Sequence, residues 1–535
     1  MVPRMRFFVE CFFVLVLGGL FFIVVQKYYT YKNFVNFFGK QETVARSILP
    51  KNPTQAELDK LASEYKKEFE EFVGTSNIVD NAAEKADAIP VLVYHGISSD
   101  TSNETIPLNE FKEQMFALKK AGYKTVTINE FYEFIKGEVE LTQNSFLLTF
   151  DDARKDSYYP VDSILSALDF HAVVFVITGH SLSDENSSYY LSKAELHQMA
   201  DNGRWDIQSH GRADHGYVTI NEKGDNGRFI IAKQWLKDEG RIETDIEYYD
   251  RIRGDLLGAK KDLEKEFNNV VISFAFPFGD YGDESQAHKI LGVVSDIYPI
   301  AFYQFRPEAR TGYYSYNFPN VGAHSFTPRR IKVFKSTTGK NIVDTLEAGK
   351  TKTLPFFESF INKKNWISTS TEGRSGFEIS ETPSLILNNN ENFSSRSVFL
   401  VGSSRWNDFK MNATAKLKSP QSFSLLARVI DGNNYVSCTY QDNQVALNQI
   451  TNKKRKKISE ASTNNKSLFI DGGRVSISVY GNFAKCYLDK TPVVSGKIFA
   501  NFGYGGVGFN IWNSEKISKS SVEIKDIEVK NINED

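Results

Sequence analysis

The chain of 535 residues is too long for one ordinary domain and predicts two or three domains. A hydrophobic fraction of 41% is ample for packed cores, whereas a formal net charge of -2 argues against a nucleic-acid-binding protein, which would carry a basic surplus. With only three cysteines, no disulfide framework is expected. Cys438 and Cys486 could pair only if their Cα atoms came within about 7 Å, so we predict that they are two buried thiols.

The first forty residues carry a targeting signal. The apolar run over 7–25 contains Glu10 as its single charge and approaches the length of about 20 residues that crosses a bilayer. No small-residue cleavage site follows the run. We therefore predict an uncleaved signal anchor over 1–40, with a cleaved signal peptide as the alternative. The N-terminus is then cytoplasmic, and the rest of the chain is extracellular at a cell membrane that it crosses once.

Residues 41–88 are predicted to form a helical stalk. Thr54 and Glu57 have the spacing of a capping box. Apolar residues at three- and four-residue spacing follow over 55–73 and predict an amphipathic helix. Packing of this helix on the next domain is favoured over binding of a partner protein.

Between residues 89 and 335, short apolar segments typical of strands alternate with helical patterns. The strand-like segments include IPVLVYHGI (89–97), NSFLLTFDD (144–152), HAVVFVITG (171–179), WDIQSH (205–210) and VVISFAFPFG (270–279). Helical patterns at 108–123 and 245–267 lie among them. This alternation predicts parallel strands covered by helices, in an α/β barrel or a doubly wound sheet.

Polar residues that suit a metal site follow four of these strands. They are Tyr94 and His95, Asp151 and Asp152, His210 and His215, and Pro277 and Phe278. Active sites of α/β folds assemble at the carboxyl ends of strands, so we expect these residues to lie close together. Each motif alone is more often structural, because an Asp pair is usually a turn and a lone histidine is usually a core residue.

The residue types indicate one chemistry. Asp152, His210 and His215 are the predicted ligands of a divalent metal, with Zn²⁺ favoured and Co²⁺ or Ni²⁺ as alternatives. Asp151 would remain unliganded and would take a proton from water that the metal activates. Together they favour metal-assisted hydrolysis of an amide or ester.

Three segments, TFDD (149–152), SHGRADH (209–215) and FAFPFG (274–279), resemble the motifs of the polysaccharide deacetylases, the NodB-homology group of carbohydrate esterase family 4. The segment VLVYHGI (91–97) resembles the branch that deacetylates poly-N-acetylglucosamine. The resemblance covers residues 89–335 and implies a distorted (β/α) barrel with a shallow groove.

The resemblance implies the same metal triad and the same base, and it adds further roles. The backbone N–H of Phe278 would help to form the oxyanion hole, and His95 would be an active-site histidine. Tyr94 and Pro277 would contact the substrate.

The segments also depart from the family pattern. The histidine pair is five residues apart rather than four, which is similar to the poly-N-acetylglucosamine branch. Ala275 stands where the family has an arginine that orients the base, so another group must orient Asp151. No late Leu-x-His motif supplies a general acid. His324 is the candidate substitute, although a structural role is favoured for it.

After residue 355 the helical pattern gives way to short alternating strands. They predict an all-β sandwich over 356–535, joined to the barrel by a linker over 336–355. Segments such as SRWNDFKM (404–411) and GGVGFNIWN (505–513) resemble concanavalin-like jelly rolls of carbohydrate-active proteins. Trp366, Trp406 and Trp512 could stack on sugars, but core packing is the favoured role of each.

The sequence therefore predicts a membrane-anchored, extracellular deacetylase that removes N-acetyl groups from an amino-sugar polysaccharide. One alternative is a non-catalytic polysaccharide-binding surface protein, which the missing arginine and general acid motivate. The other is an O-acetyl esterase with the same metal site. No nucleic-acid partner is expected, and no sequence feature identifies a protein partner.

Overall fold

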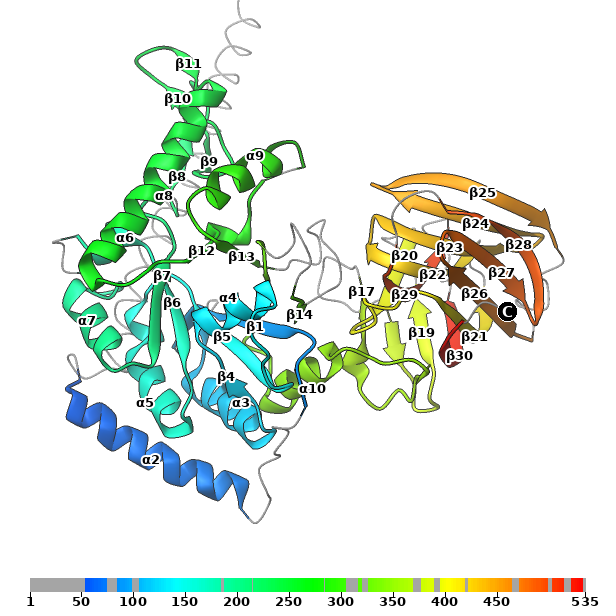
Figure 1. The fold of residues 1–535 in the computed structure, drawn as a ribbon, viewed down its shortest axis with the longest axis horizontal. Helices are drawn as coiled ribbons and strands as arrows, with labels where there is room; N and C mark the ends of the chain where they lie inside the picture. Colours follow the sequence, from blue (N-terminus) through cyan, green and yellow to red (C-terminus); the bar gives the residue numbers. More distant parts are fainter. Residues whose placement is uncertain are drawn as a thin grey trace, which may run out of the picture.

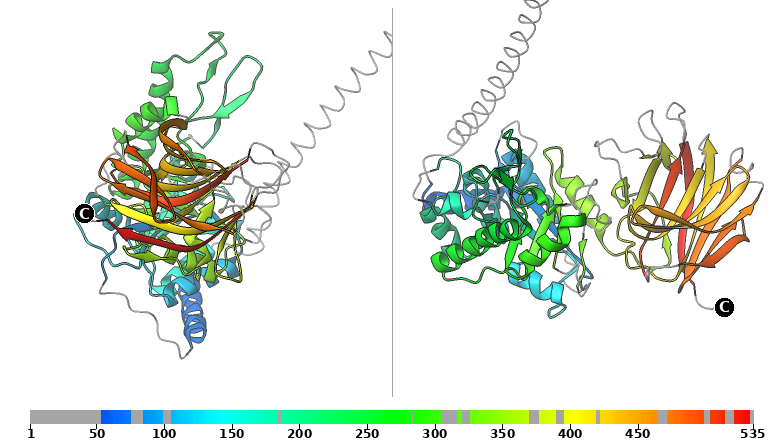
Figure 2. Two further views of the ribbon diagram at one scale, coloured as in Figure 1. Left: turned by 90° about the vertical axis from the view of Figure 1, so that its right-hand side faces the viewer. Right: turned by 90° about the horizontal axis from the view of Figure 1, so that it is seen from above.

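The computed structural model contains a barrel domain and a β-sandwich (Figures 1 and 2). It describes residues 53–74, 84–98, 105–183, 187–213, 215–282, 284–304, 316–319, 326–368, 377–388, 395–418, 422–463, 471–498, 503–513 and 521–532. Among these residues, no helix is both long enough and apolar enough to cross a bilayer. The predicted anchor over 1–40 lies outside the described residues.

Seven parallel strands close into a barrel. In spatial order they are β1 (Ile89–Tyr94), β15 (Arg329–Lys332), β13 (Ile300–Gln304), β12 (Ser273–Ala275), β7 (Trp205–Ser209), β6 (Ala172–Val176) and β5 (Ser145–Phe150). Strand β5 pairs back with β1 and completes the ring. Two short strands, β4 (Lys124–Thr125) and the antiparallel β14 (Tyr316–Asn317), lie outside the ring. The prediction of a barrel is confirmed over the doubly wound alternative.

Alternation along the strands decides which side chains enter the barrel. Val91, Leu147 and Phe302 share one buried cluster with helix α4 (Ile128–Lys136). Their neighbours in sequence, such as Leu92 and Leu148, lie in a second cluster beneath the outer helices. Because side chains alternate between the two faces of a strand, every second residue faces the interior as far as the strand's carboxyl end.

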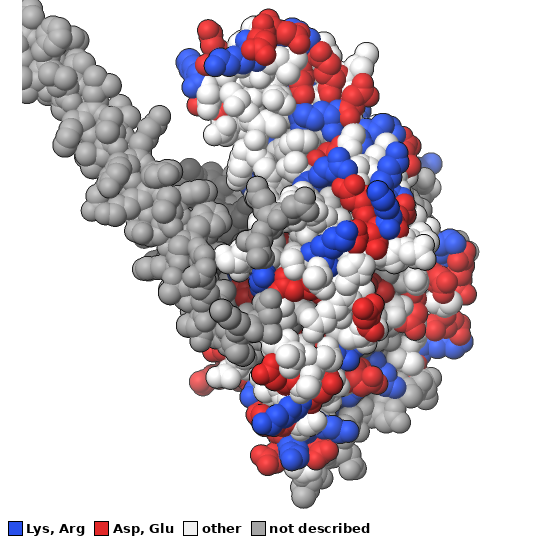
Figure 3. All heavy atoms as spheres, turned by 90° about the vertical axis from the view of Figure 1, so that its left-hand side faces the viewer, with Lys and Arg blue, Asp and Glu red and all other residues white. Residues whose placement is uncertain are grey.

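Helices cover the outside of the ring (Figure 1). They are α3 (Leu108–Lys120), α5 (Tyr159–Leu168), α6 (Thr178–Ser181), α7 (Lys193–Asp201), α8 (Asp245–Phe267) and α9 (Glu284–Ser295). Minor strands are β2 (Gly96–Ile97), β3 (Thr105–Ile106), β8 (Tyr217–Thr219), β9 (Asn226–Arg228), β10 (Trp235–Leu236) and β11 (Arg241–Ile242). The hairpin β10–β11 and the N-terminal end of α8 project from the barrel (Figure 1). On the face shown in Figure 3, acidic and basic side chains are interspersed, which is typical of a solvated surface.

Helix α2 (Gln55–Val73) is the main described element of the predicted stalk. Thr54 and Glu57 form the predicted capping box. The helix lies against the barrel, since the Ser163 hydroxyl of α5 donates to the Leu58 carbonyl at 2.9 Å and the rings of Phe69 and Phe116 are 5.2 Å apart. Over this range the segment therefore packs on the domain rather than standing free.

The prediction of a linker over 336–355 requires correction. Helix α10 (Gly339–Gly349) occupies much of it, and its residues Ile342 and Leu346 join the core of the barrel. The Gln114 side chain of α3 also donates to the Thr337 carbonyl at 2.6 Å. The apolar positions of α10 are too few to reveal the helix, which is stabilised by its packing on α3.

The C-terminal domain consists of two antiparallel sheets packed face to face. The first has the order β18-β19-β30-β21-β26-β27-β28, with β16 also paired to β30. Its strands are β16 (Phe356–Phe357), β18 (Phe377–Ile379), β19 (Leu385–Asn388), β21 (Phe409–Lys418), β26 (Gly473–Tyr480), β27 (Phe483–Leu488), β28 (Thr491–Lys497) and β30 (Ser521–Asn531). This domain is the all-β sandwich that the sequence predicts.

The second sheet has the order β17-β20-β29-β22-β23-β24-β25. Its strands are β17 (Trp366–Ser368), β20 (Ser395–Leu400), β29 (Gly506–Trp512), β22 (Ser422–Asp431), β23 (Asn434–Gln441), β24 (Gln444–Thr451) and β25 (Lys454–Ser462). The sandwich contacts the barrel domain near α10, where the Asn362 side chain donates to the Asp344 carbonyl at 2.9 Å.

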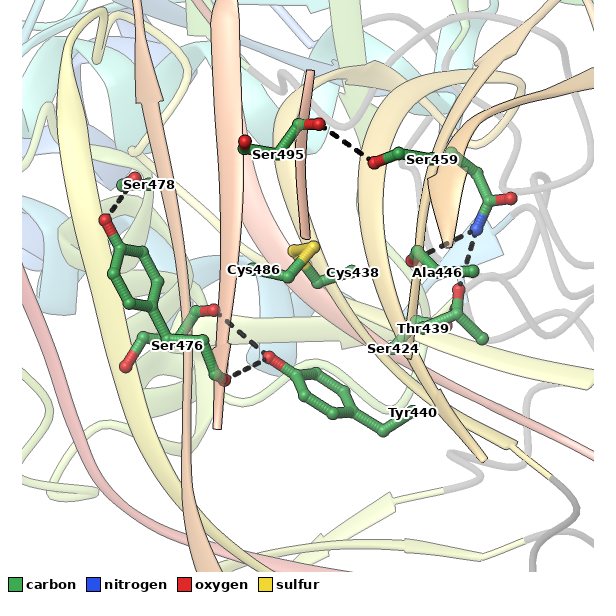
Figure 4. The surroundings of a disulfide bond; sticks show 12 residues. Ser424, Cys438, Thr439, Tyr440, Ala446, Ser459, Ser476, Ser478, Cys486 and Ser495 are labelled. Carbon is green, nitrogen blue, oxygen red and sulfur yellow. Dashed lines mark hydrogen bonds between the residues drawn. A yellow bond between two sulfur atoms is a disulfide. The ribbon is translucent and has the colours of Figure 1, made fainter. Parts of the chain in front are cut away.

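The prediction of two free thiols is wrong, because Cys438 and Cys486 form a disulfide (Figure 4). Cys438 lies on β23 and Cys486 on β27, so the bond joins the two sheets. Their Cα atoms are 5.5 Å apart across the core. Sequence spacing does not reveal such a pair, because only the packing of the sheets brings the two strands together.

Reduction of this disulfide is expected to lower the free energy of unfolding. The bond closes a loop with a sequence separation of 48 residues, and a loop of that size contributes about 4 kcal/mol in the chain-entropy account. Thermal unfolding with and without a thiol reductant measures the effect. The double variant Cys438→Ala/Cys486→Ala is the control and should not respond to the reductant. An equal melting temperature for reduced and oxidised wild-type protein would contradict the cross-link.

Candidate metal centre

The three residues predicted as metal ligands lie together at the carboxyl end of the barrel. Asp152 follows β5 in a left-handed turn with a φ of 74°, and His210 follows β7 directly. Oδ1 of Asp152 lies 3.4 Å from Nε2 of His210 and 3.4 Å from Nε2 of His215. One ligand atom from each residue falls within 4.8 Å of the others. This spacing would allow all three residues to bind one ion.

Neighbouring groups fix both imidazole rings. Nδ1 of His210 lies 2.7 Å from the Ala275 carbonyl oxygen, so Nδ1–H donates there and Nε2 presents its lone pair toward Asp152. The ring of His215 packs against Phe278, with centroids 4.6 Å apart. The motif around Ala275 and Phe278 therefore orients the two histidines.

The donor set fits a divalent first-row metal. Oδ1 of Asp152 is buried and has no hydrogen-bond partner among the described residues. A buried carboxylate oxygen without a donor is unfavourable unless a cation satisfies it. One carboxylate and two imidazoles are ligands that Zn²⁺, Co²⁺ and Ni²⁺ accept.

A buried arginine holds Asp151, the predicted base. Nη1 of Arg330 lies 2.6 Å from Oδ1 of Asp151, and Nη2 lies 2.8 Å from Oδ2. Both side chains are buried. Arg330 comes from β15 and supplies the orienting cation that Ala275 cannot supply. Sequence reasoning missed it. The available signal was an arginine within a strand, at a position whose side chain enters the barrel.

The surroundings keep both carboxylates ionised. Burial would raise the pKa of Asp151, but Arg330, with His210 and His95, outweighs burial and lowers that pKa below its ordinary value. Burial would also raise the pKa of Asp152, but the neighbouring histidines, chiefly His210, outweigh burial and lower that pKa. Asp151 can therefore accept a proton at neutral pH.

The two predicted histidine ligands shift in opposite directions. Burial would lower the pKa of His210, but the carboxylates of Asp151 and Asp152 outweigh burial and raise that pKa. Burial lowers the pKa of His215, which favours its neutral form. Protonation therefore competes with metal binding more strongly at His210 than at His215.

His95 lies beside Asp151, the predicted base. Its Nε2 is 3.8 Å from Oδ2 of Asp151 and 3.5 Å from Nε2 of Gln304. Gln304 belongs to β13 and was not predicted. Both His95 and Gln304 occupy the level of the barrel just above its apolar interior.

The prediction that Tyr94 contacts substrate is wrong for its side chain. That side chain is fully buried and faces the outer helices, where its hydroxyl donates to Oε1 of Gln114 at 2.8 Å. Its ring stacks against Phe150 and meets Phe111 edge to face. Alternation along β1 accounts for the difference, because it sends Tyr94 outward and His95 inward.

The PFG turn reaches the site. Pro277 is buried, whereas the ring of Phe278 is partly exposed and lies between His215 and Arg228, with the Arg228 guanidinium 4.6 Å from its centroid. Phe278 adopts a left-handed conformation with a φ of 59°. The oxyanion role of its N–H and the substrate contact of Pro277 remain predictions. His324 lies outside the described residues, so its role as general acid also remains a prediction.

An aromatic wall that sequence reasoning missed flanks the site. The ring of Tyr190 stacks on His180 with centroids 4.4 Å apart and an interplanar angle of 5°. The Arg154 guanidinium lies 4.7 Å from the ring centroid of Tyr189. Both tyrosines are partly buried, and Tyr190 forms a β-bridge with Arg154, two residues after Asp152, so they lie near the proposed ligands. In the sequence, the two adjacent tyrosines were the feature that could have indicated this wall.

Comparison with known proteins agrees with this geometry. Residues 138–294 match the model of the polysaccharide deacetylase family. The match includes Asp151, the three predicted ligands and the PFG turn, whereas Arg330 and His95 lie outside it.

Three relatives illustrate the similarity. The chain is 30% identical over 202 residues to YxkH of Bacillus subtilis, a polysaccharide deacetylase homologue, and the match covers 38% of this chain and 61% of the relative. It is 24% identical over 203 residues to the poly-β-1,6-N-acetyl-D-glucosamine N-deacetylase of Escherichia coli K12, covering 35% of this chain and 30% of that enzyme. It is 25% identical over 188 residues to the enzyme of the same name from Staphylococcus epidermidis, and this match covers 35% of this chain and 58% of that enzyme.

These matches span less than two thirds of each relative, and the family match lies within the barrel domain of this chain. The family match covers β5 and β7 and includes the four residues that follow these strands, Asp151, Asp152, His210 and His215. The barrel of this chain is therefore a polysaccharide deacetylase domain.

Proposed function

We propose that the chain is a metal-dependent hydrolase that removes N-acetyl groups from an extracellular amino-sugar polysaccharide. One observation carries this proposal. A base held ionised by Arg330 lies next to a set of one aspartate and two histidines that contains an unsatisfied carboxylate oxygen. A structural role would not require a buried charge of this kind beside two oriented imidazoles.

The site residues divide the work of amide hydrolysis. A divalent metal held by Asp152, His210 and His215 would supply Lewis acidity toward the acetyl carbonyl. Asp151 accepts a proton from the attacking water, and Arg330 fixes the carboxylate in place. His95 lies beside this carboxylate, with its Nε2 3.8 Å from Oδ2 of Asp151.

The relatives and the aromatic wall support the proposed substrate class. Two relatives are named for N-deacetylation of poly-β-1,6-N-acetyl-D-glucosamine, and we propose the same polymer for this chain. The stacked rings of Tyr190 and His180 offer an apolar surface on which a sugar ring can pack.

The disulfide supports an extracellular location. Structural disulfides persist in oxidising compartments and are rare in the bacterial cytoplasm. The bond between Cys438 and Cys486 thus agrees with the predicted signal anchor, which would leave the barrel and the sandwich outside the cell.

Acetate release from poly-N-acetylglucosamine tests the proposal. The full chain, purified in detergent, should release acetate with Zn²⁺, Co²⁺ or Ni²⁺ and should lose this activity with a chelator. Release from O-acetylated but not N-acetylated sugars would replace the proposal with an esterase. Binding of the polymer without release of acetate from either substrate would indicate a non-catalytic surface protein.

The His210→Ala variant is expected to weaken metal binding by at least about 100-fold, because it removes one of three protein ligands. Metal content after dialysis and acetate release should fall together. His197→Ala is the matched control, since His197 is a partly exposed histidine of α7 that pairs with Glu266. A full equivalent of metal in His210→Ala would show that His210 is not a ligand.

A further inference from the structure

A hollow of about 510 Å³ lies on the sandwich, in a different domain from the metal centre. It is lined by Ser422, Thr439, Gln441, Gln444, Ala446, Asn448, Arg455, Lys457 and Trp512. These residues belong to β22, β23, β24, β25 and β29 of the second sheet. Their neighbours Phe423, Tyr440 and Val445 lie in the core of the sandwich, so the hollow is on the outer face of the sheet.

The floor of the hollow is polar and sunken. Thr439 and Asn448 face outward from the sheet but are only 5% and 2% exposed. The Thr439 hydroxyl is 2.9 Å from that of Ser424 and accepts from the Asn448 amide at 3.2 Å. Figure 4 shows Thr439 and Ser424 near the inter-sheet disulfide. This arrangement is a fixed set of hydroxyl and amide groups, which suits hydrogen bonding to sugar hydroxyls.

One rim of the hollow carries an exposed tryptophan. Trp366 and Trp406 are 2% and 5% exposed and pack in the core, as predicted, whereas Trp512 is 39% exposed. Trp512 pairs with Ser422 across the β22–β29 ladder, next to the polar floor. An indole with a free face beside hydrogen-bonding groups is suited to stacking on a sugar ring.

The opposite rim is basic. Arg455 and Lys457 belong to a run of five consecutive cations over 453–457, all of them exposed. Glu460 pairs with Lys457 at 2.5 Å and accepts from Gln444 at 2.7 Å, but the residues that line the hollow include no carboxylate. Arg455 forms no ion pair with any carboxylate in the described part of the chain. The rim thus leaves positive charge available to a ligand.

We infer that this hollow binds an anionic glycan, in which carboxylate or phosphodiester groups accompany sugar rings. Trp512 stacks on a ring, the floor bonds to hydroxyls, and Arg455 with Lys457 pairs with the anionic group. A deacetylated amino-sugar polymer is cationic and would be repelled by this rim. The sandwich therefore recognises a polymer other than the product of the barrel, and it holds the enzyme at an anionic surface polysaccharide.

Affinity electrophoresis of the full chain in detergent tests the inference. The gels contain hyaluronan as the carboxylate polymer, polyglycerol-phosphate teichoic acid as the phosphodiester polymer, or dextran as the neutral one. Trp512→Ala and Arg455→Gln/Lys457→Gln should each weaken retention by about tenfold, the effect of losing one stacking or paired contact. The control is Lys454→Gln/Lys456→Gln, which removes the same charge from the opposite face of β25 and should retain wild-type binding.

Retention by either anionic polymer, lost in the two site variants and kept in the control, supports the site, and the polymer that retains the chain identifies the anionic group. An equal loss of retention in Arg455→Gln/Lys457→Gln and in Lys454→Gln/Lys456→Gln would show that only the overall positive charge attracts the polymer, and it would overturn the inference. Equal retention by dextran, no retention by either anionic polymer, or preferential binding to phosphatidylglycerol vesicles would also overturn it. Acetate release from short soluble oligomers should be unchanged in all these variants, so this test is independent of the catalytic proposal.

Discussion

Replacement of Asp151 by asparagine is expected to lower kcat for acetate release by about 10²- to 10⁴-fold, the usual contribution of a general base. The amide has nearly the same shape and can still accept a hydrogen bond from Arg330, but it cannot take a proton from water. Asp152 and both histidines remain, so the variant should still bind metal. Steady-state kinetics on N-acetylglucosamine oligomers, with metal content measured on the same sample, separates the two effects.

Asp206→Asn is the matched control for this prediction. Asp206 is the second residue of β7, at the opposite end of the barrel, and its Oδ2 lies 2.9 Å from Nε2 of His171. The Asp206→Asn substitution should therefore affect stability more than catalysis. Activity of Asp151→Asn within a few-fold of wild type, with metal bound, would show that another group is the base.

The Arg330→Gln variant is expected to be both less stable and shifted in its pH dependence. It leaves the Asp151 carboxylate buried without its cation, and breaking a buried ion pair in this way costs about 3–5 kcal/mol. Urea unfolding at neutral pH measures that loss. The variant Arg329→Gln is the control, because it removes a cation at the next position, whose side chain points to the opposite face of β15.

The sign of the pH effect follows from the electrostatics. Arg330 lowers the pKa of Asp151, so its removal raises that pKa. Asp151 must be ionised to accept a proton, and the acid limb of kcat/KM therefore moves to higher pH in Arg330→Gln. Arg330→Lys keeps the charge and should restore most of the profile. An unchanged acid limb in Arg330→Gln would mean that Arg330 only stabilises the fold.

The arrangement of the barrel strands explains why these residues lie together. Alternation along β1, β5 and β7 brings His95, Asp151 and His210 to the same end of the barrel, above an interior filled by apolar side chains. The packed apolar interior thus supports the site residues from below. Arg330 and Gln304 arrive at the same level on β15 and β13.

The sequence by itself was sufficient for the features that depend on local pattern. The alternation of strands and helices indicated the barrel domain, and the capping box at Thr54 began a helix as predicted. The residues that follow the strands were chemically distinctive enough to nominate Asp151, Asp152, His210 and His215 together. Such features can be read locally because strand, cap and motif each depend on residues a few positions apart.

The tertiary structure alone decided the contacts between distant segments. Asp151 and Arg330 are 179 positions apart, and Cys438 and Cys486 are 48 apart on opposite sheets. The outward direction of Tyr94 depended on the register of β1 in the ring, and α10 became a helix through its packing on the barrel. In each case the feature depends on a contact between segments that only folding brings together. A local sequence pattern cannot specify which distant segment makes that contact.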